Sequence, residues 1–119
     1  MAAPPSPPQV LAVTTPGVEG YRVARYVGIV AGEAILGTGF GADVKAGIKD
    51  FTGSRVTGWE EEIQRARFTA LSVMSQRAQA WGANAVVGVS LDTEGMGPQG
   101  SILLVTATGT AVVVEPIPR

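Results

Sequence analysis

The segment from Thr57 to Gly82 restricts the possible folds most strongly, because its apolar residues recur at the period of an amphipathic helix. In helical projection these residues fall on one broad arc, opposite the polar ones: Ile63, Ala66, Ala70, Leu71, Val73, Met74, Ala78 and Trp81. Thr57 with Glu60 has the spacing of an N-terminal capping box, and the glutamates at 60–62 would lie in the first turn, where the helix dipole favours them. Gly82 is typical of the position that follows a C-terminus. We predict a helix of roughly 23 residues, which needs a sheet against its apolar side.

Runs of β-prone residues on both sides of this helix supply that sheet. They predict four strands, at 10–15, 21–34, 85–92 and 102–114. Between them we expect a loop over Gly37–Ala42, a short helix from about Asp43 to Phe51, and a flexible, glycine-rich connection over 93–101. The predicted fold class is α+β, with two layers: an antiparallel sheet packed against one long helix plus a short helix.

Composition sets the number of domains and the expected assembly. The chain has 119 residues, of which 45% are hydrophobic and 16% charged, and this is a large apolar fraction for one small domain to bury. The last predicted strand is apolar on both faces, whereas in a sheet with one face exposed to solvent, apolar and polar residues normally alternate along each strand. We therefore expect a homo-oligomer in which a second copy covers the other face. The expected organisation is a disordered proline-rich tail at 1–9, a single domain at 10–115 and a C-terminal tail at 116–119.

Charge and cysteine content exclude several classes of function. The net charge is −1, so no basic surface for nucleic acid is expected, and the sequence has no cysteine for disulfide or thiolate chemistry. No apolar run reaches the length of a membrane span, and the N-terminus lacks the pattern of a signal peptide. We expect a soluble cytoplasmic protein that neither inserts into membranes nor binds nucleic acid.

Several segments together resemble one known family. They are GIVAGEAILG (28–37), AGIKD (46–50), Gly53 with Arg55, Ala66-Arg67, GANAVVGVSLD (82–92) and GTAV (109–112), in collinear order over about residues 10–114. This combination is similar to the YbjQ-like family, which is labelled as heavy-metal-binding. The resemblance implies a two-layer α/β subunit, like that of dodecin, which assembles into a ring-shaped pentamer. It implies no established reaction.

The family label makes metal binding a hypothesis that the donor residues must support. The sequence contains neither histidine nor cysteine, which are the usual ligands of zinc, copper and softer ions. Carboxylates remain, and Asp92 and Glu94, two residues apart, could share a face at a strand end and hold a hard divalent cation. Asp43 is a further candidate ligand. The structural alternative is that these carboxylates are solvated or ion-paired.

Arginines near the apolar arc suggest a second kind of site. Arg67 and Arg77 lie within or at the border of that arc, where a guanidinium must reach water or a carboxylate. The structural interpretation is an ion pair with Glu33, Asp43 or Asp50, and the functional one is a pocket for an anionic ligand. Arg55, expected in a loop beside Gly53 and Ser54, is a further anion contact. The candidate ligand-binding residues are Arg55, Arg67, Glu33 and Asp50.

Motifs for catalysis and for nucleotide binding are weak. Gly37–Ala42 fits G-x-G-x-x-A, but the chain shows no acidic residue at the end of a second parallel strand, so a loop passing close to a neighbouring segment is the better interpretation. No histidine is present to activate a serine. We therefore expect a non-catalytic, homo-oligomeric scaffold or small-ligand-binding protein, not an enzyme. A metal- or anion-binding protein with its sites at subunit junctions is the alternative.

Overall fold

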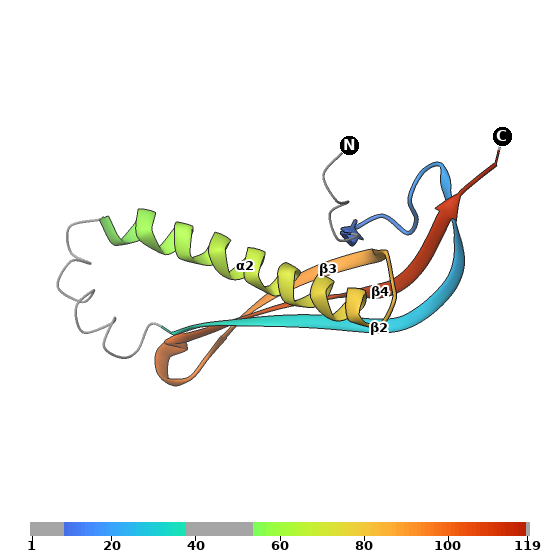
Figure 1. The fold of residues 1–119 in the computed structure, drawn as a ribbon. Coiled ribbons are helices and arrows are strands. Elements are labelled where there is room, and N and C mark those ends of the chain that lie inside the picture. Colours follow the sequence, from blue (N-terminus) through green and yellow to red (C-terminus); the bar gives the residue numbers. More distant parts are fainter. Residues whose placement is uncertain (1–8, 38–53, 119) are drawn as a thin grey trace, which may run out of the picture.

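The computed structural model describes residues 9–37 and 54–118, and in the second segment the side chains from Glu60 onward. It shows an α+β fold in which one long helix covers one face of a curled four-stranded sheet (Figure 1). The strands are β1 (Leu11–Ala12), β2 (Tyr21–Gly37), β3 (Ala85–Met96) and β4 (Ile102–Pro116), and the helix is α2 (Ser54–Ala80). The two-layer α+β prediction is confirmed at this level. The predicted short helix at Asp43–Phe51, and the predicted loop beyond Gly37, lie outside the described residues.

The sheet is mixed, so the prediction of a purely antiparallel sheet is wrong. Its strand order is β1-β3-β4-β2, with β4 antiparallel to both β2 and β3, while β1 pairs with β3 in parallel. A short hairpin forces the two strands that it joins to run antiparallel. β1 and β3 are far apart in the sequence, so they are free to pair in parallel. Register shifts between Tyr26 and Gly28 and between Val87 and Ser90 accompany the curvature.

Helix α2 is longer at its N-terminus than the capping-box pattern predicted. It begins at Ser54, so Thr57 and the glutamates at 60–62 lie inside the helix and not at its cap and first turn. Once a helix is nucleated, each further residue adds a hydrogen bond at low entropic cost, so residues of modest propensity can extend it. The predicted C-terminus is confirmed. Gly82 has φ +94°, its N–H bonds to Gln79 O at 2.9 Å, and Ala83 N–H bonds to Ala78 O at 3.0 Å, which is the Schellman pattern.

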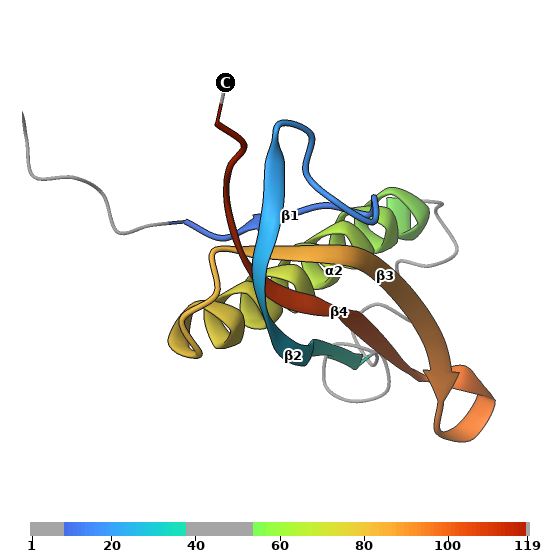
Figure 2. The same cartoon turned by 90° about the vertical axis from the view of Figure 1, so that its right-hand side faces the viewer.

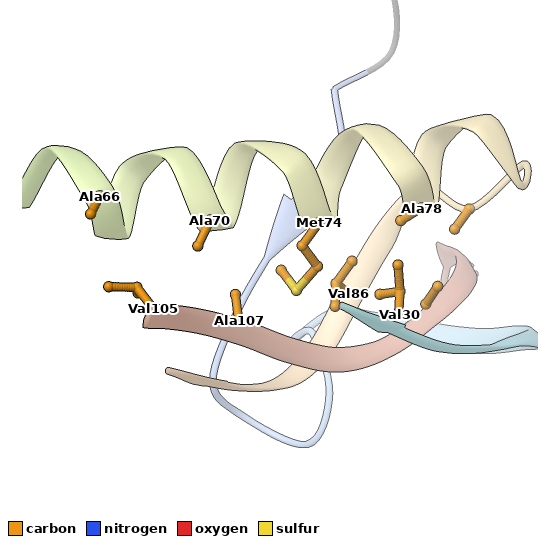
Figure 3. Packing of buried hydrophobic residues seen from close by; sticks show 10 residues of the cluster. Val30, Ala66, Ala70, Met74, Ala78, Val86, Val105 and Ala107 are labelled. Carbon is orange, nitrogen blue, oxygen red and sulfur yellow. The ribbon is translucent and has the colours of Figure 1, made fainter. Parts of the chain in front are cut away.

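The core between α2 and the sheet is made largely of small side chains. Figure 3 shows Ala66, Ala70, Met74 and Ala78 spaced along the lower side of the helix above the sheet, and all four are buried. Residues four apart form one ridge of a helix, so the buried side of α2 is this narrow ridge and not the broad arc that was predicted. Ile63, Leu71 and Val73 are only partly buried, and Trp81 is 49% exposed. The facing sheet residues include Val30, Val86, Val105 and Ala107.

Strand boundaries differ from prediction mainly at the β3–β4 connection. The segment at 93–101 was predicted to be a flexible loop, but β3 continues to Met96 and β4 starts at Ile102, with a 3-10 turn at Pro98–Gly100 between them. Figure 2 shows the two strands running together towards this hairpin. Glycines weaken a strand but do not prevent it when β4 offers a continuous partner. At the other end, β1 is shorter than the predicted 10–15 strand, although Val13 and Thr15 still make backbone hydrogen bonds to β3.

Within the described residues, no helix combines the length and apolar character needed to cross a bilayer.

Candidate functional site

The sheet face opposite α2, called the open face below, carries a row of exposed apolar side chains along β2. Tyr26, Ile29 and Ile35 are 70%, 81% and 73% exposed. They pair across the strands with Val112, Thr110 and Leu104, which alternate with the helix-facing residues of β4 and therefore share the open face. We call Tyr26, Ile29 and Ile35 the β2 stripe. Apolar groups of this size gathered along one strand mark a surface suited to contact with another apolar surface.

One end of the open face is covered by the chain itself. Ala85, Val87 and Val112 form a second buried cluster, against which Val13 and Val18 of the N-terminal segment pack. At this end the chain's own N-terminal segment therefore packs on the face that we expected a second copy to cover. The predicted 10–15 strand contributes to the fold by this packing as well as by its short ladder. The β2 stripe stays exposed to solvent in the single chain.

Two of the proposed cation ligands do share a face, as predicted. Asp92 and Glu94 of β3 pair with Thr106 and Leu104 of β4, so both lie on the open face, and both are exposed. Glu33 of β2 pairs with Thr106 from the other side, which places one carboxylate on each side of that threonine. Neighbouring strands are about 4.8 Å apart, so the Glu33 and Asp92 backbones are separated by roughly 10 Å.

Glu33 already has a cationic partner within the chain. Arg77 Nη1 lies 3.2 Å from Glu33 Oε1 and donates a hydrogen bond of 2.8 Å to the carbonyl oxygen of Ala31. The predicted ion pair between a helix arginine and Glu33 is thus confirmed for Arg77. It lowers the availability of Glu33 as a ligand for another ion.

The other predicted anion-binding residues are not gathered into one site. Arg67 is exposed on α2 and forms no ion pair with another residue that the structure describes. Arg55 lies in the first turn of α2, so the prediction that it lies in a loop is wrong. Asp43 and Asp50 are outside the described residues. Their proposed roles stay predictions.

A shallow pocket lies between α2 and the last residues of β2, and the sequence did not indicate it. Its volume is about 200 Å³, and its lining is Ala34, Ile35, Leu36, Glu62, Arg65, Ala66 and Thr69. At its rim Arg65 Nη1 donates a hydrogen bond of 2.9 Å to Glu62 Oε2. The three-residue spacing of this pair along a helix was the only available signal. Because both charges neutralise each other and are exposed, the pocket presents no free charge to select a ligand.

The donor residues fit a hard cation better than a heavy metal. The whole sequence lacks histidine and cysteine, and the described residues contain no group of three or more carboxylates able to enclose an ion. Soft and borderline metals prefer sulfur and imidazole nitrogen, whereas carboxylate oxygens suit magnesium, calcium and manganese. Among the described carboxylates, Asp92 and Glu94 offer such an ion one pair of ligands on a shared face.

A similar fold occurs in a crystal structure from Pediococcus pentosaceus, of a protein with unknown function that belongs to the DUF74 family. The two structures superimpose with a TM-score of 0.58 over 89% of this chain and 98% of that one. Their sequences are 16% identical, so this likeness concerns the fold alone.

Sequence comparison identifies closer relatives. A UPF0145 protein of Bifidobacterium longum strain DJO10A is 48% identical over 105 residues, which cover 88% of this chain and 96% of the relative. A second UPF0145 protein, from Bifidobacterium longum subsp. infantis, is 47% identical over 106 residues, or 89% and 96% of the two chains. Neither name states an enzymatic activity. The profile of the YbjQ family, whose description reads "Putative heavy-metal-binding", matches residues 10–115. The chain therefore belongs to the YbjQ family, to which the names UPF0145 and DUF74 also refer.

Proposed function

We propose that this protein is a non-catalytic subunit that assembles with copies of itself, as the pentamer that the family resemblance implies, and serves as a scaffold or small-ligand-binding protein. The observation that carries the proposal is the β2 stripe, where Tyr26, Ile29 and Ile35 are each at least 70% exposed on one strand. Fully burying one such side chain contributes about 1.5–3 kcal/mol, so the three together offset a large part of the cost of association.

The position of the stripe favours contact through the sheet and not through the helix. The side chains of the stripe project from the face of the sheet that α2 does not cover, and their high exposure shows that another molecule can reach them. Phe68 on α2 is also 70% exposed, but it is the one residue of the described helix among the large hydrophobic residues with such high exposure. Single exposed apolar residues are common on monomeric proteins, whereas a row on one strand is not.

Sedimentation velocity, combined with light scattering, tests this proposal. We expect the wild-type protein to have a fixed mass that is a multiple of 12.2 kDa at micromolar concentration. Ile29→Asp places a charge in the stripe and should lower that mass towards one chain. Phe68→Asp, at a position that is also highly exposed but lies on α2, is the matched control and should leave the mass unchanged. A folded wild-type protein that sediments as one chain overturns the proposal.

Binding of a hard cation is the second candidate, and the shared face of Asp92 and Glu94 favours it. Two carboxylates on adjacent open-face positions attract a divalent cation, and assembly could add oxygen ligands from a neighbouring copy. Calorimetric titration with calcium, magnesium and manganese tests it. Asp92→Asn with Glu94→Gln should abolish saturable heat, while Glu61→Gln, an exposed helix carboxylate, should not. Titrations of the wild-type protein without saturable heat for all three ions exclude this candidate.

A further inference from the structure

The outer edge of β2 is long and, in the part of the chain that the structure describes, lacks a strand partner. The strand has 17 residues, β4 lies along one side of it, and no strand of the described residues pairs with its other side. An edge of this kind presents unpaired backbone groups to other chains, and exposed apolar side chains such as Ile29 and Ile35 increase the hazard. Proteins with such edges usually carry a feature that prevents uncontrolled strand pairing.

Arg77 occupies the middle of this edge. Gly32 faces α2, because a Cβ atom at Gly32 would lie 2.9 Å from Met74 Cα. Side chains alternate along a strand, so Glu33 points to the opposite face of the sheet. Arg77 begins on α2 and yet reaches both carboxylate oxygens of Glu33, at 3.2 and 3.3 Å, so its side chain must pass around the outer edge of β2.

The same guanidinium also binds the backbone of the edge strand. Arg77 Nη1 donates a 2.8 Å hydrogen bond to the carbonyl oxygen of Ala31. An added strand would lie about 4.8 Å from β2 and would need such carbonyl oxygens as acceptors. The guanidinium therefore removes one acceptor, fills the space beside it and places a charge where a further backbone would have to run.

We infer that the contact of Arg77 with Ala31 and Glu33 blocks strand addition at the outer edge of β2, and so directs self-association of this chain to side-chain contacts on the open face. A role in folding stability alone explains the contact less well. The Arg77 and Glu33 side chains are 49% and 44% exposed, and ion pairs this exposed contribute little to stability. The occupant that the contact excludes is a second copy, because every copy presents the same unpaired edge.

The test compares Arg77→Met with Arg65→Met in the full chain. Methionine keeps the aliphatic length that packs on the helix but cannot donate a hydrogen bond, so loss of packing is limited. Arg65 is the matched control, because it is an exposed helix arginine whose ion pair is with Glu62 of the same helix and not with a residue of β2. Light scattering and thioflavin T fluorescence are followed over time, at a temperature well below the unfolding midpoints of both variants.

For Arg77→Met we expect the fixed mass of the wild-type protein to be lost, with mass and thioflavin fluorescence rising over time. Arg65→Met should keep the wild-type mass. Arg77→Lys, which retains the charge at the edge, should slow the rise. A folded Arg77→Met protein that keeps the wild-type mass and binds no thioflavin overturns the inference. The wild-type mass alone decides the proposed function, so a wild-type monomer would refute that proposal and leave the edge test intact.

Discussion

Gly32 lies directly beneath the backbone of Met74, so that β2 and α2 touch main chain to main chain. A Cβ atom at Gly32 would lie 2.9 Å from Met74 Cα and would also clash with Ala70 O and Met74 N. The alanines of the helix ridge permit this approach, since larger side chains at 66, 70 and 78 would hold the two layers apart. The thinness of the core therefore depends on small residues from both layers.

Replacement of Gly32 by alanine should destabilise the fold strongly. The new methyl group meets helix backbone, which cannot rotate away, so we expect a loss of about 2–3 kcal/mol or more in the free energy of unfolding. Urea denaturation measures it. Gly37→Ala in the same strand is the control, because nothing lies within 4 Å of its added Cβ. Equal losses for the two variants would contradict the close contact.

Asn84 completes the sheet with its side chain and should be sensitive to substitution. Its Nδ2 donates to Val114 O at 3.0 Å, and its Oδ1 accepts from Val114 N at 2.8 Å, so the amide acts as one more strand residue beside β4. We expect Asn84→Ala to lower the unfolding free energy by about 1–2 kcal/mol, roughly the net value of two hydrogen bonds. Thermal unfolding monitored by circular dichroism measures the change. Gln64→Ala, on the exposed side of α2, should stay within about 0.5 kcal/mol of wild type.

Gly82 should be intolerant of a side chain for a conformational reason and not for lack of space. Its φ is +94°, and the nearest atom to an added Cβ is Arg25 Nη2 at 4.0 Å. The left-handed region costs an L-residue about 1–2 kcal/mol, so Gly82→Ala should destabilise the protein by that amount. Gly17→Ala is the control, with open space around it and no positive φ. The same denaturation assay applies, and a Gly82→Ala protein as stable as Gly17→Ala would refute the assignment.

Soft metals should not bind specifically, whatever the description of the family. This chain has no thiolate or imidazole to hold zinc or cadmium. A ligand that binds only the folded state would raise the unfolding temperature as its concentration increases. We therefore expect no saturable rise in the midpoint with either ion in thermal-shift measurements. A saturable rise that disappears on addition of chelator would show that carboxylates of several copies form a heavy-metal site.

Part of the candidate surface could be predicted from residue spacing alone. Asp92 and Glu94 are two residues apart in a strand, and that spacing places both on one face wherever the strand lies. The pairing of a helix arginine with Glu33 could also be predicted, because a guanidinium at the border of the apolar arc is unfavourable unless it reaches water or a carboxylate. Spacing could not show that Arg77, and not Arg67, makes this pair, because the choice depends on which side of α2 lies over β2.

Two of the errors have a common physical origin, which is that partners distant in sequence override local preference. The glycines between Asp92 and Ile102 predict a loop, yet pairing with β4 keeps β3 extended to Met96. Val13 was expected only to be part of a strand, and together with Val18 it covers one end of the open face.

The sequence by itself determined the elements and their class: one long amphipathic helix ended by Gly82, and strands with little polar surface on either face. Periodicity and backbone preference are local properties, so they can be read without the fold. The tertiary structure alone decided that β1 runs parallel to β3, that Gly32 touches Met74, and that Arg77 passes around the edge of β2. These contacts join residues about 40 or more positions apart, and their geometry follows from how the layers pack.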